Sequence, residues 1–314
     1  MPNGLYINYN DGRPPMEITA GMKCPSLCQD FGGYDDRRET IIPEILQGGT
    51  PFFTTDYTAS YFPPTGVGII GAISYLNKVS FDGTLMRQEV KSNGTVLNSM
   101  VSGQVWQIFP ASTPQGNRGL LIADSTDFTA ITDTSKIATC VFSGWVHING
   151  EYTLPADGLV FAKWNHAEAT LTKKSGKILA YRNYKDSGDF SIELDVYIAI
   201  FSVSSPVPGT GLNIFNAAGQ CTFSTTRKPL ILGGFRVFNS DWQDVGNNMV
   251  LLGTNGYESS SHGGWCRLRK RGLMMSGNSI KTGNSKTRSI WTSQYAIISS
   301  ANSNMSIPLI PYIY

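Results

Sequence analysis

The sequence predicts an all-β protein made of several antiparallel, β-sandwich-like modules with little helix. Three observations lead to this prediction. One long segment alternates apolar and polar residues, Asn-Gly and Asp-Gly turns separate other strand-like segments, and helical periodicity is nearly absent. The best helical candidate, residues 39–47, is interrupted by Pro43, which cannot donate the hydrogen bond that a helix interior requires.

The clearest predicted strand covers residues 190–201, with the sequence FSIELDVYIAIF. Its apolar residues recur at every second position and would share one face, because side chains alternate between the two faces of a strand. The other face would carry Glu193 and Asp195. Further strands are predicted at residues 104–109, 137–142, 159–164, 177–181 and 235–238.

Turn sequences indicate how these strands are connected. Asn-Gly and Asp-Gly pairs readily adopt the positive φ angles of tight hairpin turns. Such pairs lie at 82–83, 93–94, 149–150 and 157–158, and Ser-Gly pairs follow at 175–176 and 187–188. We therefore expect hairpin connections along most of the chain.

A short motif, Gly-Leu-x-Ile, occurs three times, at residues 4–7, 119–122 and 211–214. After a polar segment, each copy is followed by an apolar residue and then a hydroxyl residue: Ile18-Thr19, Ile131-Thr132 and Phe223-Ser224. Reuse of one motif at this spacing is typical of modules assembled for shape. A single catalytic cleft would need no such repetition.

The repeats suggest a division of the chain. Two polar, proline-bearing loops, 112–118 and 202–210, precede the second and third copies and are suitable module boundaries. We expect an irregular β or extended assembly segment at 1–100, a β-sandwich-like module at 101–205, and a basic β module at 206–314 with an apolar carboxyl-terminal arm.

The carboxyl-terminal arm has the sequence SIPLIPYIY. Its large apolar residues are candidates for an interface: Ile307, Leu309, Ile310, Tyr312, Ile313 and Tyr314. A free end of this kind would be a sticky patch, so we expect it to dock either into its own fold or onto a neighbouring subunit. Pro308 and Pro311 would restrict it to an edge strand or an extended arm.

Charge is sparse and unevenly distributed. Charged residues make up 15% of the chain and the net charge is +2. Residues 206–314 contain ten Lys and Arg but only three Asp and Glu. The tightest basic cluster is Arg267, Arg269, Lys270 and Arg271, followed by Lys281, Lys286 and Arg288. The cluster is either a solvated loop or a contact surface for an anionic partner, such as a phosphate-bearing polysaccharide, a membrane surface or a nucleic acid. Interleaved Gly, Ser and Asn argue against a nucleic-acid-binding helix.

We expect the chain to be made and folded in a cytoplasm. The amino terminus has no basic start followed by an apolar core, and the longest apolar stretch, 66–76, is too short to span a bilayer. The odd number of cysteines, five, does not suggest a disulfide framework. We expect no membrane span.

No catalytic or cofactor-binding residues are predicted. Residues 66–71 match the GxGxxG pattern, but no helix pattern follows to receive a pyrophosphate. Glu193 and Asp195 could form a glycosidase-like carboxylate pair, or simply be solvated on one strand face. A weak metal candidate remains, because Cys24, Cys28, His262 and Cys266 have the ligand types of a zinc site. The alternative is that these four residues are unrelated.

Four segments carry a family resemblance: GLLIADSTDF at 119–128, INGEYTLP at 148–155, GLVFAKW at 158–164 and GLNIFNAAGQ at 211–220. They resemble accessory tail proteins of lambda-like siphophages and enterobacterial prophages, over most of the chain and most strongly at residues 100–235. The resemblance implies a β-rich virion component of the distal tail, assembled in the host cytoplasm. It implies no catalytic residues.

Three functions follow from these features. The first is a structural component of a siphophage tail tip or tail fibre that contacts other tail proteins, forms a homo-oligomer with a trimer favoured, and touches the host surface. The second is a carbohydrate-binding module for lipopolysaccharide, with aromatic and basic contacts. The third is a glycan-degrading tailspike enzyme. We expect the first, a non-enzymatic role without cofactors.

Overall fold

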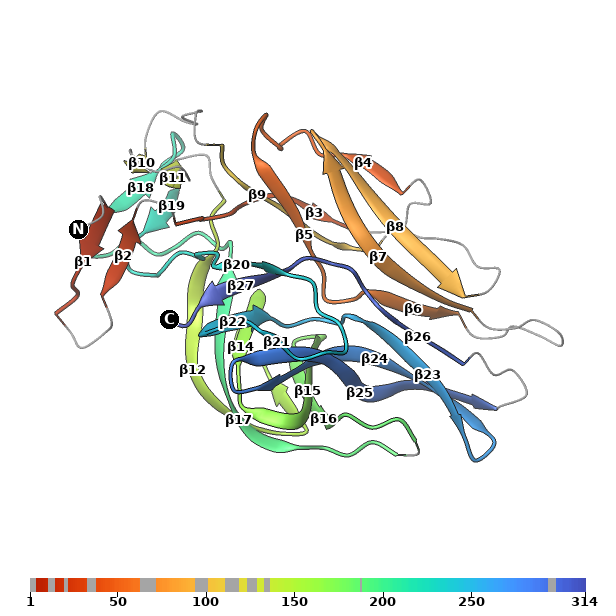
Figure 1. Cartoon of the computed structure of the whole chain (residues 1–314). Helices are drawn as coiled ribbons and strands as arrows, with labels where there is room; N and C mark the ends of the chain where they lie inside the picture. The colour runs from red at the N-terminus through yellow and green to blue at the C-terminus, as the bar shows by residue number, and fades with distance from the viewer. Residues whose placement is uncertain are drawn as a thin grey trace.

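The computed structural model describes residues 4–10, 15–19, 22–32, 38–62, 72–93, 101–110, 119–122, 129–132, 136–186, 188–292 and 298–314. These ranges contain 27 β-strands, every strand pairing is antiparallel, and no helix occurs in them (Figure 1). The predicted all-β class with several antiparallel sheets is therefore confirmed. No described segment forms a helix with the length and hydrophobicity of a bilayer crossing.

The strands fall into three consecutive groups. The first group has nine strands: β1 (Gly4–Ile7), β2 (Met16–Thr19), β3 (Ser26–Phe31), β4 (Glu39–Ile41), β5 (Thr50–Thr54), β6 (Ala59–Phe62), β7 (Ala72–Asp82), β8 (Leu85–Asn93) and β9 (Gly103–Ile108). β1 and β2 form a hairpin, and the rest form two sheets with the orders β3-β9-β5 and β4-β8-β7-β6. β1 to β8 lie in the segment 1–100, and β9 pairs with strands of that segment.

The second group has eight strands: β10 (Gly119–Ile122), β11 (Thr129–Thr132), β12 (Thr139–Asn149), β13 (Glu151–Thr153), β14 (Leu159–Lys163), β15 (His166–Lys174), β16 (Lys177–Arg182) and β17 (Glu193–Ser202). It also begins with a hairpin, β10-β11, followed by the strand orders β12-β17-β14 and β13-β16-β15. β17 is the predicted alternating strand, with Leu194, Val196 and Ile198 buried and with Glu193 and Asp195 exposed.

The third group has ten strands: β18 (Asn213–Phe215), β19 (Cys221–Ser224), β20 (Gly234–Arg236), β21 (Gln243–Asp244), β22 (Asn248–Leu251), β23 (Gly256–His262), β24 (Trp265–Ser276), β25 (Ser279–Thr292), β26 (Ser299–Asn302) and β27 (Ile307–Pro311). After the hairpin β18-β19, the strand orders are β20-β27-β22 and β21-β25-β24-β23-β26.

The three groups repeat one topology. In each, a hairpin is followed by a three-stranded layer whose middle strand is the last of the group: β9, β17 and β27. In each, a long hairpin pairs through its second strand with a short strand: β8 with β4, β16 with β13, and β25 with β21. The group boundaries coincide with the three copies of Gly-Leu-x-Ile. We therefore describe the chain as three structural repeats.

Each copy of the motif contributes to the hairpin of its repeat. Leu5 lies opposite Ile18, and Leu120 lies opposite Ile131. In the third hairpin the register is shifted by two residues, so that Ile214 lies opposite Phe223. An even shift keeps every side chain on its original face, because strand faces alternate with a period of two. The first and third hairpins pack together with Ile137 in one apolar cluster.

The segments that follow the hairpins are joined in a ring. Three equivalent backbone hydrogen bonds close it: Leu27 N to Lys136 O at 3.0 Å, Cys140 N to Lys228 O at 2.8 Å, and Leu232 N to Lys23 O at 2.9 Å. Each of the three lysines lies five residues after the apolar residue of its own motif. Each repeat therefore donates to the next and accepts from the previous one, which gives the chain an internal approximate threefold symmetry.

A shared core lies at this ring. Residues of the segments that form the ring and residues of the inner strands of each repeat meet in one cluster: Leu27, Phe52, Trp106, Ala138, Leu159, Phe161, Ala199, Phe201, Leu230, Leu232, Met249, Leu251 and Ile310. Full burial of one such side chain contributes about 1.5–3 kcal/mol. Since all three repeats supply residues, none of them completes this core alone.

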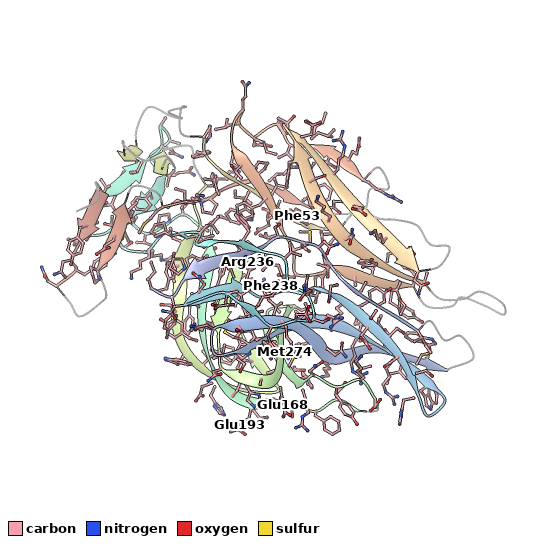
Figure 2. The ribbon with its side chains drawn as sticks, in the orientation of Figure 1. Phe53, Glu168, Glu193, Arg236, Phe238 and Met274 are labelled. Carbon is pink, nitrogen blue, oxygen red and sulfur yellow. The ribbon has the colours of Figure 1, made fainter. Side chains whose placement is uncertain are left out.

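Two further cores lie between the layers. In the first repeat, Phe53, Val105 and Leu76 lie in the core between the two sheets, and Figure 2 shows Phe53 within the fold. The second and third repeats share one core, and pairing of β14 with β22 and of β15 with β24 merges their strands into a 14-stranded sheet. The first repeat joins the third through Thr58, whose backbone N–H donates to Thr254 Oγ1 at 2.8 Å.

The carboxyl-terminal segment corrects one prediction. β27 is neither an edge strand nor a free arm, because it pairs with β20 on one side and with β22 on the other. Leu309 and Ile310 are buried, whereas Ile307, Tyr312 and Tyr314 are partly buried and Ile313 is exposed. The Tyr314 hydroxyl donates to Pro229 O at 3.0 Å and accepts from Ile231 N at 2.8 Å.

The two prolines take different positions in these pairings. Pro311 lies opposite Asn248 at the end of the ladder with β22, whereas Pro308 lies opposite Phe235 in the middle of the three-residue ladder with β20 and outside the ladder with β22. Neither proline can donate a backbone hydrogen bond to a ladder. Five of the six predicted interface residues are thus packed against their own chain, and Ile313 alone among them keeps a largely exposed side chain.

Replacement of Gly272 by Ala should destabilise the fold where the second and third repeats meet. An added Cβ would lie 2.4 Å from the carbonyl oxygen of Leu171 and 2.3 Å from Cγ2 of Thr172. We expect a loss of about 1–3 kcal/mol in the free energy of unfolding, measured by urea denaturation. Gly32→Ala is the matched control, since nothing lies within 4 Å of a Cβ there. Equal stability of the two variants would contradict the close packing of β15 on β24.

Candidate functional site

A basic cavity lies where the three repeats meet. Its volume is about 360 Å³ and its walls come from all three repeats: Tyr57 from the first; Glu151, Thr172, Lys173, Lys174, Ser175, Lys177 and Leu179 from the second; and Thr254, Lys270, Ser285, Lys286, Thr287 and Arg288 from the third. Six of these residues are Lys or Arg, and Glu151 is the one acidic residue among them. Volumes of this size are typical of small-molecule sites.

Irregular pairing of β24 with β25 brings the cations of the third repeat together. Arg269 pairs with Thr287 and Arg271 pairs with Asn284, so two residues of β25, Ser285 and Lys286, lie opposite Lys270 alone. A second register shift follows, at Arg288. Bulges redirect side chains relative to a regular strand and are common next to functional sites. Here they allow Lys270, Lys286 and Arg288 to line the same cavity.

The cations of the second repeat are positioned by a tight turn. Lys174 pairs with Lys177, and the two residues between them, Ser175 and Gly176, have φ angles of 48° and 73°. Positive φ at both central positions is typical of a type I′ turn. The turn connects β15 to β16, as the Ser-Gly pair predicts, and presents its basic residues to the cavity.

Three of the six cations form ion pairs with two carboxylates. Glu151 accepts from Lys177 at 3.2 Å and from Lys286 at 3.0 Å. Lys173 donates to Asp56 at 3.0 Å and to the carbonyl oxygen of Gly158 at 2.9 Å. The Lys173 pair links the first repeat to the second, and its ammonium group is therefore already fully engaged.

The other three cations, Lys174, Lys270 and Arg288, have no carboxylate partner among the described residues. The Lys270 ammonium group lies 4.3 Å from the centre of the Tyr57 ring. Burial, together with the like charges of Arg288 and Lys174, lowers the pKa of Lys270 to about 8. Partly desolvated like charges of this kind favour the binding of an anion, which would offset their repulsion.

Hydroxyl groups complete the cavity wall. The Tyr57 and Ser175 hydroxyls lie 3.3 Å apart, and the Thr172 and Ser285 hydroxyls lie 3.1 Å apart. Hydroxyls donate and accept hydrogen bonds, so they suit both oxyanions and sugar hydroxyls. The arrangement can bind a charged, oxygen-rich ligand. It offers no pairing of a nucleophile with a general base.

Arg269 is not the surface contact that its sequence position suggests. Its side chain is 1% exposed, and its guanidinium donates to the carbonyl oxygens of Lys185 at 3.0 Å and of Asp186 and Gly188, both at 2.9 Å. It therefore anchors the loop between β16 and β17. Arg267 and Arg271 are partly buried, and Arg271 donates to Ser240 Oγ. Of the four predicted contact residues, Lys270 alone lines the cavity.

The predicted zinc ligands do not come together. No group of three or more His, Cys, Asp or Glu side chains within the described ranges is placed to hold a metal ion. Cys28 lies in the core of the first repeat, and Cys266 lies in a different apolar cluster. Burial raises the pKa of the Cys24 thiol to about 12, and burial together with the charge of Glu44 raises that of Cys28 to about 12.

The carboxylate pair of β17 lies on an open surface. His147 of β12 bridges the two groups, with Nδ1 at 2.9 Å from Asp195 and Nε2 at 3.1 Å from Glu193. Figure 2 shows Glu193 at the periphery of the fold. Both carboxylates raise the pKa of His147 above its usual value, that of Asp195 by the larger amount. The GxGxxG pattern at 66–71 lies outside the described residues.

Several cavity residues have only weak signals in the sequence. Lys286 and Arg288 belong to the basic stretch of residues 206–314, but Tyr57 lies in the region that looks least regular. The run Lys173-Lys174-Ser-Gly-Lys177 is recognisable as a turn with three basic residues. Nothing local shows that this turn lies against β25, because that contact depends on pairing between repeats.

Comparison with known families gives one match, over residues 4–293, to a family of unknown function (DUF6453). The chain belongs to this family. No curated protein and no solved structure matches it. The match begins at Gly4 of the first motif copy and extends through β25, so it covers the first two repeats, the third repeat up to β25, and all residues of the basic cavity.

Loss of the Arg269 anchor should destabilise the DUF6453 fold. Arg269→Gln leaves the carbonyls of residues 185, 186 and 188 without their common donor. We expect the free energy of unfolding, measured by urea denaturation, to fall by about 3 kcal/mol. Arg236→Gln removes an exposed guanidinium and should change it by less than about 0.5 kcal/mol. A loss below about 1 kcal/mol for the Arg269 variant would refute the anchoring role.

Lys270 should make stability depend on pH in a defined direction. Its folded pKa, about 8, lies below its ordinary value of 10.5, so the folded state loses the proton first as pH rises. The wild type should therefore gain stability relative to Lys270→Met between about pH 8 and pH 10.5, and at pH 7 the variant should be the more stable by about 1–3 kcal/mol. Urea denaturation of the wild type and the variant at pH 7 and pH 10 measures the difference in stability and its change with pH. A constant difference between the two proteins would contradict the buried charge.

Proposed function

We propose that this DUF6453 protein is a structural component of a siphophage tail tip or tail fibre, assembled in the host cytoplasm and carried in the virion tail. The observation that carries the proposal is the internal threefold arrangement: three repeats of one β topology, closed by three equivalent backbone hydrogen bonds. The resemblance to accessory tail proteins of lambda-like siphophages supports the same role.

Symmetry gives the proposal a physical basis. Assemblies of identical subunits have closed symmetry, and trimers are common among phage tail tips and fibres. A chain with three quasi-equivalent repeats can offer three similar surfaces to such a partner. The homotrimer predicted from the sequence would be a second way to match a threefold-symmetric partner. Sedimentation velocity of the purified chain distinguishes one copy from three.

A second function, recognition of cell-surface carbohydrate such as lipopolysaccharide, is favoured by the basic cavity with its hydroxyl-bearing wall. It is compatible with the structural role, because the ring of hydrogen bonds and the cavity use different residues. For the glycan-degrading alternative we find less support, since the side chains of Glu193 and Asp195 are 63% and 70% exposed.

The tail role predicts where the protein lies in the virion and which density disappears when the protein is absent. In a phage that carries this gene, gold-labelled antibody should bind the distal end of the tail, and particles lacking the protein should lose density there in negative-stain images. Wild-type protein supplied in trans should restore that density. Virions with intact tail ends and no antibody label would overturn the proposal.

A further inference from the structure

We propose that the basic cavity binds a phosphate-bearing saccharide, with Lys174, Lys270 and Arg288 as the contacts to the phosphate group. This inference does not rest on the tail role, because a scaffold of the same shape needs no cavity of this charge. It assigns a ligand class and contact residues to a site between repeats.

The balance of charge within the cavity favours a dianionic group. Glu151 and Asp56 supply two negative charges, which they share among Lys177, Lys286 and Lys173. Lys174, Lys270 and Arg288 face the same volume without a carboxylate partner among the described residues, so the cavity keeps an excess of positive charge. A phosphate monoester carries nearly two negative charges at neutral pH and has three acceptor oxygens. A single carboxylate has half that charge, so it would neutralise the cluster less completely.

The size and composition of the cavity favour a sugar attached to the phosphate. A volume of about 360 Å³ exceeds what a phosphate group alone fills. The wall also has polar groups that do not require an anion: the hydroxyls of Tyr57, Ser175 and Ser285, and the Glu151 carboxylate, which has more acceptor sites than its two lysine partners use. Such groups suit the hydroxyls of a sugar ring.

The position of the cavity links binding to the stability of the whole fold. Tyr57 belongs to the first repeat, Lys174 to the second, and Lys270 and Arg288 to the third. A ligand that contacts all three binds the folded arrangement and not the separated repeats. It should therefore raise the thermal unfolding midpoint. Binding should also raise the pKa of Lys270, which is partly desolvated beside Lys174 and Arg288, because an anion favours the protonated form.

Isothermal titration calorimetry of the full chain at pH 7.5 tests the proposal with four probes: mannose 6-phosphate, inorganic pyrophosphate, mannose and glucuronic acid. We expect mannose 6-phosphate to bind with the highest affinity. The variant K174Q/R288Q should weaken its binding about tenfold or more, because two charge-assisted contacts are lost. Neither side chain has a hydrogen bond or ion pair in the described structure that would make its loss disruptive.

The matched control is R236Q/K281Q, which removes the same charge outside the cavity and should change the affinity less than about twofold. Thermal unfolding gives a readout that is independent of calorimetry: mannose 6-phosphate should raise the midpoint of the wild type and of R236Q/K281Q, and should raise that of K174Q/R288Q much less. Circular dichroism of each variant checks that it folds. Should K174Q/R288Q fail to fold, the single variant R288Q carries the same comparison against K281Q.

Each contrary result is decisive. Equal affinity for mannose and mannose 6-phosphate, equal affinity of the two double variants, or no binding at about 10 mM ligand would overturn the proposal. Pyrophosphate binding as tightly as mannose 6-phosphate would overturn the saccharide part. A short single-stranded DNA that binds more tightly, through the same two residues, would assign the cavity to nucleic acid instead. None of these results affects the antibody and deletion tests of the tail role.

Discussion

Three backbone hydrogen bonds between the segments that follow the hairpins determine how the rest of the chain is arranged. Each joins the N–H of Leu27, Cys140 or Leu232 to the carbonyl of a lysine in another repeat. Backbone groups that lie in a core must be paired, so these bonds are required once Leu27 and Leu232 are buried with Cys140 packed against the same cluster. The ring and the core thus require one another, and a repeat separated from the other two would expose both.

Closure of the ring has consequences at a distance. It brings the inner strands of the three repeats against one core, and it allows the second and third repeats to merge their strands into one sheet. The contact of β15 with β24 follows from that merger. Because Lys174 ends β15 and Lys270 lies on β24, the same contact also creates the basic cavity. The candidate site is therefore a product of the assembly of repeats, not of any one repeat.

The cavity holds a partly buried cation that has no carboxylate partner among the described residues. By contrast, the buried Arg269 is satisfied by three carbonyl oxygens. In the cavity, Lys270 is partly desolvated beside two like charges, and an aromatic ring is its nearest compensation. Such an arrangement lowers the stability of the folded state. Retained instability of this kind is a common property of binding sites.

The sequence by itself determined the local features of this protein: the all-β class, the alternating faces of β17, the tight turn at Ser175-Gly176 and the three motif copies that became hairpins. These depend on the two-residue period of strands and on turn chemistry, both of which act over a few neighbouring residues. Only the tertiary structure decided that β27 is an interior strand, that Arg269 is buried, that Cys28 and Cys266 lie in different clusters, and that Lys174 and Arg288 line one cavity. Each of those outcomes depends on which distant strand becomes the partner, and an alternating pattern shows which face is apolar without showing what will cover it.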